Sequence, residues 1–416
     1  ARAPVVTPEK RPEPARPGPG GPSTAASFLK KAAASHGVKV AAQLETARFV
    51  TRSPAFNRAC GIGGLPLSGR YIVIMGPWGG GKSTLMARVL ADVARGGGVG
   101  YYADVERTRT ASWFEAAGLR EGEYVYAKHR SQEEHQDHIL QFLLDAAKAK
   151  RAGDLPEDAP VLAVVDTVTE FAPEGKLDGS VGSKDYGLSA NLLNDWMKPI
   201  LVLGEEAGAS VCLVSQERRK PPPFTGAPDW MCVKPTTGDA VEYGASLLFR
   251  TERGGGLKEG EIKCGAEHRI RVIKSKFAPD SRAGGAGIPT WYVSNGEGEA
   301  PLGPDLVREV VSSALDLGVL RKGSGGGAEE EPAPEAVRGR GRDKIKRALR
   351  GAGEVDGEAK KRGGGRVEAA WDAGLSWGGE GLLRKKLRAD DDFLYELEER
   401  VRAAVDAEAR ALGHRV

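Results

Sequence analysis

The chain has 416 residues, which is enough for one large domain and one or two small ones. Its 60 basic and 57 acidic residues leave a net charge of +3, and this small excess alone does not require a nucleic-acid partner. The four cysteines form no CxxC pair, which argues against a zinc site and a disulfide framework and predicts reduced thiols in the cytoplasm. No apolar run approaches about 18 residues, so no membrane partner is expected.

The first residues differ in composition from those that follow. Residues 1–22 are rich in Pro, Ala and Arg, which predicts a disordered arm without the apolar core of a signal peptide. Residues 24–36 are rich in Ala and predict a short helix that Thr24 could cap.

The strongest pattern is GPWGGGKST at 76–84, directly after the apolar run 71–75. A strand that ends in G-x-x-x-x-G-K-[ST] and opens into a helix predicts a phosphate-binding loop, because its glycines let backbone N–H groups turn inward. Lys82 can reach the β- and γ-phosphates, and the Ser83 hydroxyl can hold Mg²⁺. The sequence therefore predicts a nucleoside triphosphate site made of Gly76, Pro77, Trp78, Gly79, Gly80, Gly81, Lys82, Ser83 and Thr84.

Residues 47–297 show alternating strand and helix patterns. Continuous apolar strands between helices indicate an α/β fold whose mostly parallel sheet is covered on both faces. Strands are predicted at 71–75, 99–103, 161–165, 210–214, 246–250 and 269–274, and helices at 83–94, 131–150 and 187–207.

Polar residues follow several of these strands, where parallel sheets bind their ligands. Asp166 ends the strand at 161–165 and is expected to join Ser83 in the Mg²⁺ shell. Asp104 or Glu106 could orient and deprotonate the attacking water. Gln216 could sense the γ-phosphate, although a solvent-facing glutamine is the more common explanation for such a residue taken alone.

Two irregular segments follow strands of the predicted site. Residues 217–238 form an unusually long segment without periodicity, which indicates a functional loop. This segment mixes cations with aromatic side chains, as a surface that tracks a nucleic-acid backbone and stacks on bases would. Residues 176–187 form a shorter irregular segment before a helix, so one nucleotide switch could set both loops.

Composition changes again beyond a helical segment at 304–322. Residues 323–366 are rich in Gly and charge, which predicts a disordered insertion. Order is expected to return near Trp371, and residues 390–410 place apolar side chains at helical spacing behind an acidic first turn. The basic run 338–350 could add phosphate contacts or serve as a solubilising linker.

His135 and His138 invite a metal interpretation, since Glu133 and Glu134 stand beside them. They lie in a charged helix, far in sequence from other candidate ligands. A solvated helix face is the simpler prediction.

Taken together in chain order, these motifs resemble the RecA family of recombinases over residues 24–322 and again near 376–410. The matching segments are GPWGGGKSTL, YYADVER, VLAVVDTVTEFAPEGKLDG, VCLVSQERR, PTTGDAVEYGASLLFR and HRIRVIKSKFAP. The resemblance implies a RecA-like P-loop ATPase core over 47–297, with DNA-binding loops at 176–187 and 217–238. It also implies an N-terminal oligomerisation segment at 23–46 and a small α+β C-terminal lobe at 298–416, interrupted by 323–366.

The resemblance also implies roles for single residues. Glu106 rather than Asp104 would activate water, and Gln216 would couple the γ-phosphate to the second loop. Lys274 and Lys276 would reach a neighbouring protomer's nucleotide across a filament interface, and Trp113 would lie against the adenine ring. The DNA-binding residues would be Lys184, Tyr186, Arg218, Arg219, Lys220, Phe224, Trp230 and Lys234.

The implied activity is a DNA-dependent ATPase that uses ATP and Mg²⁺ and forms helical filaments on single-stranded DNA for pairing with double-stranded DNA. Some positions depart from the family pattern, which suggests a divergent bacterial, phage or plasmid member. Glu242 replaces a lysine beside the interface aromatic Tyr243, Asn191 replaces an arginine, and Pro221–Pro223 stiffen the second loop. Two alternatives stay open. The first is a ring helicase or repair accessory ATPase without strand exchange, against which the two loops and the pair Lys274 and Lys276 argue. The second is a filament-forming regulator, which Glu242 and Asn191 keep possible.

Overall fold

The computed structural model describes most of the chain from Ala47 onward, and this part forms one compact unit. The described residues that fall in the predicted helix 24–36 are helical, whereas the predicted arm 1–22 lies outside the described residues. The described residues are Ser27, Lys31, Ala34, Ser35, 47–177, 187–277, 285, 287–297, 299–322, 367–370, 375–377, 380–412 and 414.

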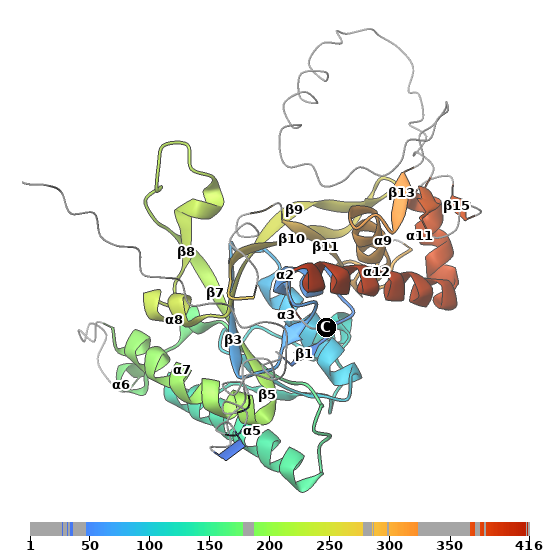
Figure 1. The fold of residues 1–416 in the computed structure, drawn as a ribbon. Helices are drawn as coiled ribbons and strands as arrows, with labels where there is room; N and C mark the ends of the chain where they lie inside the picture. The colour runs from blue at the N-terminus through green and yellow to red at the C-terminus, as the bar shows by residue number, and fades with distance from the viewer. Residues whose placement is uncertain are drawn as a thin grey trace, which may run out of the picture. The chain divides into compact units, whose positions relative to one another are not determined.

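One large sheet organises the described part of the chain from Ala47 on. Its strands are β3 (Arg70–Gly76), β4 (Val99–Asp104), β5 (Val125–Ala127), β6 (Val161–Asp166), β7 (Ala209–Arg219), β8 (Val233–Pro235), β9 (Leu247–Glu259), β10 (Ile262–Ser275), β11 (Ile288–Val293) and β12 (Gly303–Pro304). Their order is β12-β11-β10-β9-β3-β7-β6-β4-β5. β8 pairs with β7 beside this row (Figure 1). Neighbours from β9 to β5 run parallel, whereas β10 to β12 continue from β9 in antiparallel pairs. The predicted α/β class with a mostly parallel central sheet is confirmed.

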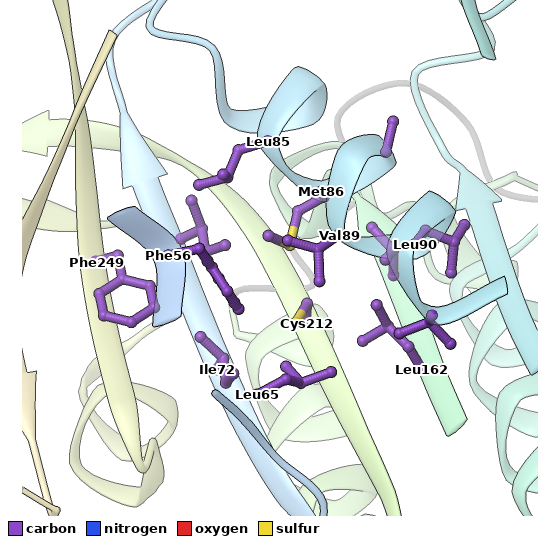
Figure 2. Close-up of a cluster of buried hydrophobic side chains, with 14 of the residues drawn as sticks. Phe56, Leu65, Ile72, Leu85, Met86, Val89, Leu90, Leu162, Cys212 and Phe249 are labelled. Carbon is purple, nitrogen blue, oxygen red and sulfur yellow. The ribbon is translucent and has the colours of Figure 1, made fainter. Parts of the chain in front are cut away.

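Helices cover both faces of this sheet. One face carries α2 (Pro54–Cys60), α3 (Lys82–Arg95) and α4 (Ala111–Ala117), and the other carries α5 (Gln132–Ala152) and α7 (Leu188–Ala207). In β3, Ile72 belongs to the same buried cluster as Met86 of α3 and Cys212 of β7 (Figure 2), whereas Val73 and Met75 pack with the second group of helices. Successive strand residues point to opposite faces, so a strand buried on both sides has a continuous apolar sequence.

The remaining short elements of this region connect the larger ones, and β1 pairs with β2 in a separate small sheet. These elements are β1 (Arg48–Phe49), β2 (Leu65–Pro66), η2 (Val168–Glu170), α6 (Glu174–Leu177), η3 (Asp229–Cys232) and α8 (Asp239–Gly244).

Three predicted strands are longer in the structure than predicted. The strand predicted at 210–214 continues as β7 to Arg219, because Glu217, Arg218 and Arg219 pair through their backbones with β8, while the side chains of Gln216, Arg218 and Arg219 are exposed. The strands predicted at 246–250 and 269–274 are the inner parts of one long hairpin, β9 with β10. Their outer parts are polar and glycine-rich, so they lack the apolar pattern from which the strands were predicted.

The C-terminal part contains its own apolar cluster, in which Val310, Leu383, Leu397 and Val401 are buried. The segment predicted as helical at 304–322 ends its helix at Asp316 and continues into a strand. The helix predicted at 390–410 is present, and Asp390 caps it through the N–H of Phe393. The elements are α9 (Leu306–Asp316), β13 (Leu320–Lys322), β14 (Val367–Ala369), β15 (Ser376–Trp377), α11 (Glu380–Ala389) and α12 (Asp391–Ala411).

The insertion predicted at 323–366 and Trp371 lie outside the described residues. None of the helices in the described ranges has the length and apolar character needed to cross a bilayer.

A buried carboxylate joins α9 to the core. The Glu309 side chain is fully buried, and Arg88 of α3 forms an ion pair with it at 6% side-chain exposure. Glu309 Oε1 also accepts hydrogen bonds from Ser53 Oγ at 2.6 Å and from the Ala55 N–H at 3.2 Å. Thr290 of β11 donates to its second oxygen. One carboxylate therefore ties α9 to α2, α3 and β11.

We predict that Glu309→Ala lowers the free energy of unfolding by about 3–5 kcal/mol, because it leaves the Arg88 guanidinium buried without a counter-ion. Urea unfolding followed by circular dichroism measures this loss. Glu396→Ala, which removes an exposed ion pair with Arg400 on α12, is the control and should change the unfolding midpoint little. Equal midpoints for Glu309→Ala and the wild-type chain would show that the buried pair adds nothing.

Candidate nucleotide-binding site and adjoining loop

A pocket of 520 Å³ lies at the carboxyl ends of β3, β4, β6 and β7. Parallel strands bring their carboxyl ends to one edge of a sheet, so residues far apart in sequence meet there. The pocket is lined by residues 76–84 and by Glu106, Thr108, Arg109, Asp166, Gln216 and Glu217.

The backbone of the loop at 76–84 has the form of an anion cradle. Gly79 and Gly81 have φ angles of 68° and 85°, a region that favours glycine. A Cβ on Gly81 would lie 2.6 Å from Nδ1 of His268, so only glycine fits at this position. Gly81 precedes α3 and offers no side-chain cap, so the first N–H groups of that helix remain available to an anion.

Lys82 lies over this loop. Its Nζ donates to the carbonyl oxygens of Gly76 and Pro77 at 3.0 and 2.9 Å. Burial lowers the pKa of Lys82, and the neighbouring carboxylates of Asp166 and Glu106 oppose that shift. An ammonium group that has lost much of its hydration gains strongly from a bound phosphate.

Ser83 and Asp166 lie together, as the sequence predicts. Ser83 Oγ donates to Asp166 Oδ1 at 3.0 Å, and Tyr102 donates to Oδ2 at 2.5 Å. A hydroxyl and a carboxylate are hard oxygen donors that suit Mg²⁺, which usually takes its other ligands from phosphates and water. Within the described ranges, no group of three or more His, Cys, Asp or Glu side chains could hold a metal alone. The residues present therefore fit a magnesium ion that arrives with a triphosphate.

Arg109 is a pocket residue that the sequence reasoning missed. Its Nη2 donates to Ser83 Oγ at 2.7 Å and to Asp166 Oδ2 at 3.0 Å, and it lies 3.9 Å from Glu106. Its guanidinium carbon lies 4.5 Å from the ring centroid of Trp113, in a cation–π contact. The only sequence signal was a cation three residues after Glu106, within the turn that follows β4.

The two carboxylates after β4 differ in position. Asp104 is buried and accepts hydrogen bonds from Tyr126 at 2.7 Å and from the N–H of Arg109 at 3.0 Å, so it fixes the turn. Glu106 is partly exposed and lines the pocket. Burial and the nearby Asp166 carboxylate raise the pKa of Glu106 above its usual value.

Gln216 lines the same pocket, and Thr169 and Glu170 hold it. Its N–H donates to Thr169 Oγ1 at 3.0 Å, and its side-chain Nε2 donates to Glu170 at 3.3 Å. Glu170 belongs to η2, which follows β6 and Asp166. Gln216 therefore connects the ends of β6 and β7 beside the pocket.

Three predicted nucleotide-site residues do not line this pocket within one chain. Trp113 packs against the apolar core of α3 and contacts Arg109. Lys274 Nζ donates to the carbonyl oxygen of Glu242 at 2.8 Å, and Lys276 Nζ donates to that of Gly244 at 2.7 Å. Both lysines thus lie against α8, beside Tyr243, whose side chain is 76% exposed.

The second predicted loop displays its cations. Arg218, Arg219, Lys220 and Phe224 are exposed, whereas Trp230 and Lys234 are partly buried. Two of the cations pair with acids nearby: Arg219 with Asp229 at 2.6 Å and Lys234 with Asp239 at 2.8 Å. Lys184 and Tyr186 of the first loop lie outside the described residues.

The solvated histidine face predicted on α5 is wrong for His135. His135 is buried at 2% exposure, and burial lowers its pKa to about 4. His138 is exposed, and its ring stacks on that of His129 with centroids 4.0 Å apart. The charged neighbours in sequence concealed the buried position, because His135 lies on the apolar side of the helix with Ile139.

Comparisons with known proteins agree with this geometry. The model of the family described as "RecA N-terminal domain" matches residues 25–289, which is more than half of the chain. The chain is 27% identical to "Protein RecA" of Wolbachia pipientis subsp. Culex pipiens over 75% of its length and 79% of that protein. It is 28% identical to "Protein RecA" of Thioalkalivibrio sulfidiphilus over 75% and 82%, and 29% identical to that of Bifidobacterium breve over 72% and 69%. The chain belongs to the RecA family.

Proposed function

We propose that this chain is a DNA-dependent ATPase that forms filaments on single-stranded DNA and drives homologous pairing and strand exchange in DNA recombination and repair. The observation that carries the proposal is the continuity of β7. This strand contributes Gln216 to the nucleotide pocket and then exposes Arg218 and Arg219, and Lys220 is exposed directly after its end; we refer to these three residues as the cations of β7. A residue of the nucleotide pocket and the cations that we assign to DNA therefore lie next to one another in the chain.

In this proposal, the loop 76–84 and Lys82 hold the phosphates of ATP. Ser83 and Asp166 hold Mg²⁺, which neutralises phosphate charge when bound. Glu106 orients the attacking water and accepts its proton, and its raised pKa makes it a stronger base than an ordinary surface carboxylate. Trp113 would lie against the adenine ring.

A neighbouring protomer completes the proposed site. Lys274 and Lys276 are directed to α8 within their own chain, so we assign them to the nucleotide of the next protomer, where they would stabilise transition-state charge. Tyr243, with its exposed ring, would lie at that interface. Residues 23–46 would dock on another protomer, and the part of the chain after 298 would receive double-stranded DNA. Lys184, Tyr186, Phe224, Trp230 and Lys234 would join the cations of β7 on single-stranded DNA.

A strand-exchange assay with homologous linear duplex and circular single-stranded DNA tests the proposal directly. We expect ATP-dependent joint molecules, and negative-stain electron microscopy should show helical filaments on the DNA. Closed rings would favour the ring-helicase alternative, and filaments without joint molecules would favour an accessory or regulatory protein.

We predict that Lys82→Ala lowers DNA-stimulated ATP hydrolysis by about 10²-fold or more, because it removes the cation that faces the phosphates. A coupled-enzyme assay for ADP release measures the rate. Lys148→Ala, at an exposed ion pair on α5, is the control and should hydrolyse ATP as the wild type does. Hydrolysis that persists in Lys82→Ala would mean that the active site lies elsewhere.

The position of Arg109 predicts an effect on metal affinity. Mg²⁺ and Arg109 would compete for Ser83 and Asp166, so the metal must break a charge-assisted hydrogen bond of Arg109 in order to bind. Arg109→Ala removes this cost and should strengthen metal binding roughly tenfold. Electron paramagnetic resonance of Mn²⁺ with ADP and protein measures this affinity without hydrolysis. Arg107→Ala is the control, since Arg107 is exposed and donates to the carbonyl oxygen of His129. Weaker binding in Arg109→Ala would instead make Arg109 a contributor to the nucleotide complex.

The exposed cations of β7 predict a change in salt dependence. The double variant Arg218→Ala/Lys220→Ala should weaken binding to single-stranded DNA and reduce the slope of log K against log salt by about 0.7 for each phosphate that the variant no longer neutralises. Fluorescence anisotropy of a labelled oligonucleotide measures both quantities. Lys198→Ala, an exposed lysine of α7, is the control. An unchanged slope would place the DNA on another surface.

A further inference from the structure

A buried arginine connects the nucleotide pocket to the second loop. Arg250 of β9 is 7% exposed. Its Nε and Nη2 donate to both carboxylate oxygens of Glu217 at 2.8 and 3.0 Å, and Nη2 also donates to Asp229 Oδ2 at 2.7 Å. Its Nη1 lies 3.4 Å from Glu252. We refer to Arg250, Glu217, Asp229 and Glu252 as the Arg250 cluster.

We propose that Arg250 is the positioning residue that makes DNA affinity depend on the bound nucleotide, because it joins Glu217 in the wall of the nucleotide pocket to Asp229 in the segment between β7 and β8. This inference rests on the proposed function. It assigns the link to a residue that touches neither phosphate nor DNA.

The sheet register places Arg250 beside the phosphate loop. Arg250 is the β-sheet partner of Met75 in β3, and Gly76 is the partner of Gln216 in β7. Because β3 lies between β9 and β7, the contact from Arg250 to Glu217 spans the end of β3 where the phosphate loop begins. A movement of the phosphate loop would therefore change the geometry of the ion pair between Arg250 and Glu217.

The first ligand acts on the cluster through Glu217. This carboxylate lines the nucleotide pocket and interacts electrostatically with Lys82. A triphosphate bound to Lys82 brings further negative charge near Glu217. The Glu217 carboxylate is then more costly to leave without Arg250, so the ion pair is favoured. The pair is largely shielded from water, with side-chain exposures of 8% for Arg250 and 14% for Glu217, so screening is weak.

The second ligand acts through Asp229. Asp229 pairs with Arg219 at 2.6 Å and with Arg250 at 2.7 Å. Arg219 is one of the exposed cations that we assign to DNA. A DNA phosphate that takes Arg219 leaves Asp229 to Arg250, so both ligands change the charges around the same guanidinium. Coupling of this kind is a free energy shared by the two binding sites and must be reciprocal.

Arg250→Lys tests whether the coupling of nucleotide and DNA binding needs the hydrogen bonds of Arg250 or only its positive charge. Lysine keeps the positive charge, but its single ammonium cannot hold Glu217 with two parallel bonds while also reaching Asp229. Arg271→Lys is the matched control for the remaining contact of the cluster, because Arg271 is the sheet partner of Arg250 on β10 and pairs with Glu252, whereas Arg250 pairs with Glu217 and Asp229.

The experiment measures binding of a labelled single-stranded oligonucleotide by anisotropy, with Mg²⁺ and either a non-hydrolysable ATP analogue or ADP. The ratio of the two affinities is the coupling. We expect a wild-type ratio within the typical range of about 5- to 150-fold. Arg250→Lys should reduce that ratio to roughly twofold or less, with nucleotide affinity nearly unchanged, and Arg271→Lys should keep the wild-type ratio.

Each outcome bears on the proposal. A wild-type ratio in Arg250→Lys, or an equal loss in Arg271→Lys, would overturn it. If Arg250→Lys does not fold, as judged by circular dichroism, Glu217→Gln tests the same contact from the other side and should also lower the ratio. A wild-type chain that binds DNA equally well with the ATP analogue and with ADP contradicts the proposed function itself. A coupled wild-type chain whose ratio is unchanged in Arg250→Lys and Glu217→Gln contradicts only the role of Arg250.

Discussion

The constraint on which this structure depends is the emergence of the phosphate loop between two strands of a buried parallel sheet. β3 ends at Gly76 with β7 on one side and β9 on the other. Whatever binds over the loop is therefore bordered by the carboxyl ends of both neighbours. β7 supplies Gln216 and Glu217 and then leaves the sheet as a cationic strand, and β9 supplies Arg250. The order of these three strands therefore places the nucleotide pocket next to the cations that follow Glu217.

Buried or partly buried charges join elements of the described structure at three places. Glu309 joins α9 to α2, α3 and β11, Arg109 joins the turn after β4 to Ser83 and Asp166, and Arg250 joins β9 to β7 and η3. A buried charge that loses its partner is costly, so each of these contacts restricts the arrangement of the elements that it joins. Two of the three border the nucleotide pocket, where a bound ligand would change the local charge.

Local patterns predicted the sheet and the phosphate loop, because glycine spacing and continuous apolar strands each involve residues that are close together in sequence. Longer-range features were missed. Glu217 to Arg219 extend β7 through backbone pairing with β8, which no side-chain pattern reveals. Arg109 and Arg250 became site candidates only when their partners from other elements were placed. The resemblance of the ordered motifs to a family supplied Lys274 and Lys276 as candidates. It also selected Glu106 over Asp104, which the residues alone had left as equal candidates.

The most direct measurement is the steady-state rate of ATP hydrolysis by the full chain with Mg²⁺, with and without single-stranded DNA, across a range of salt concentrations. The account predicts slow hydrolysis by the protein alone, strong stimulation by DNA, and loss of that stimulation as salt weakens the cationic contacts of β7. A rate that is equally fast without DNA, and that salt does not change, would contradict the account.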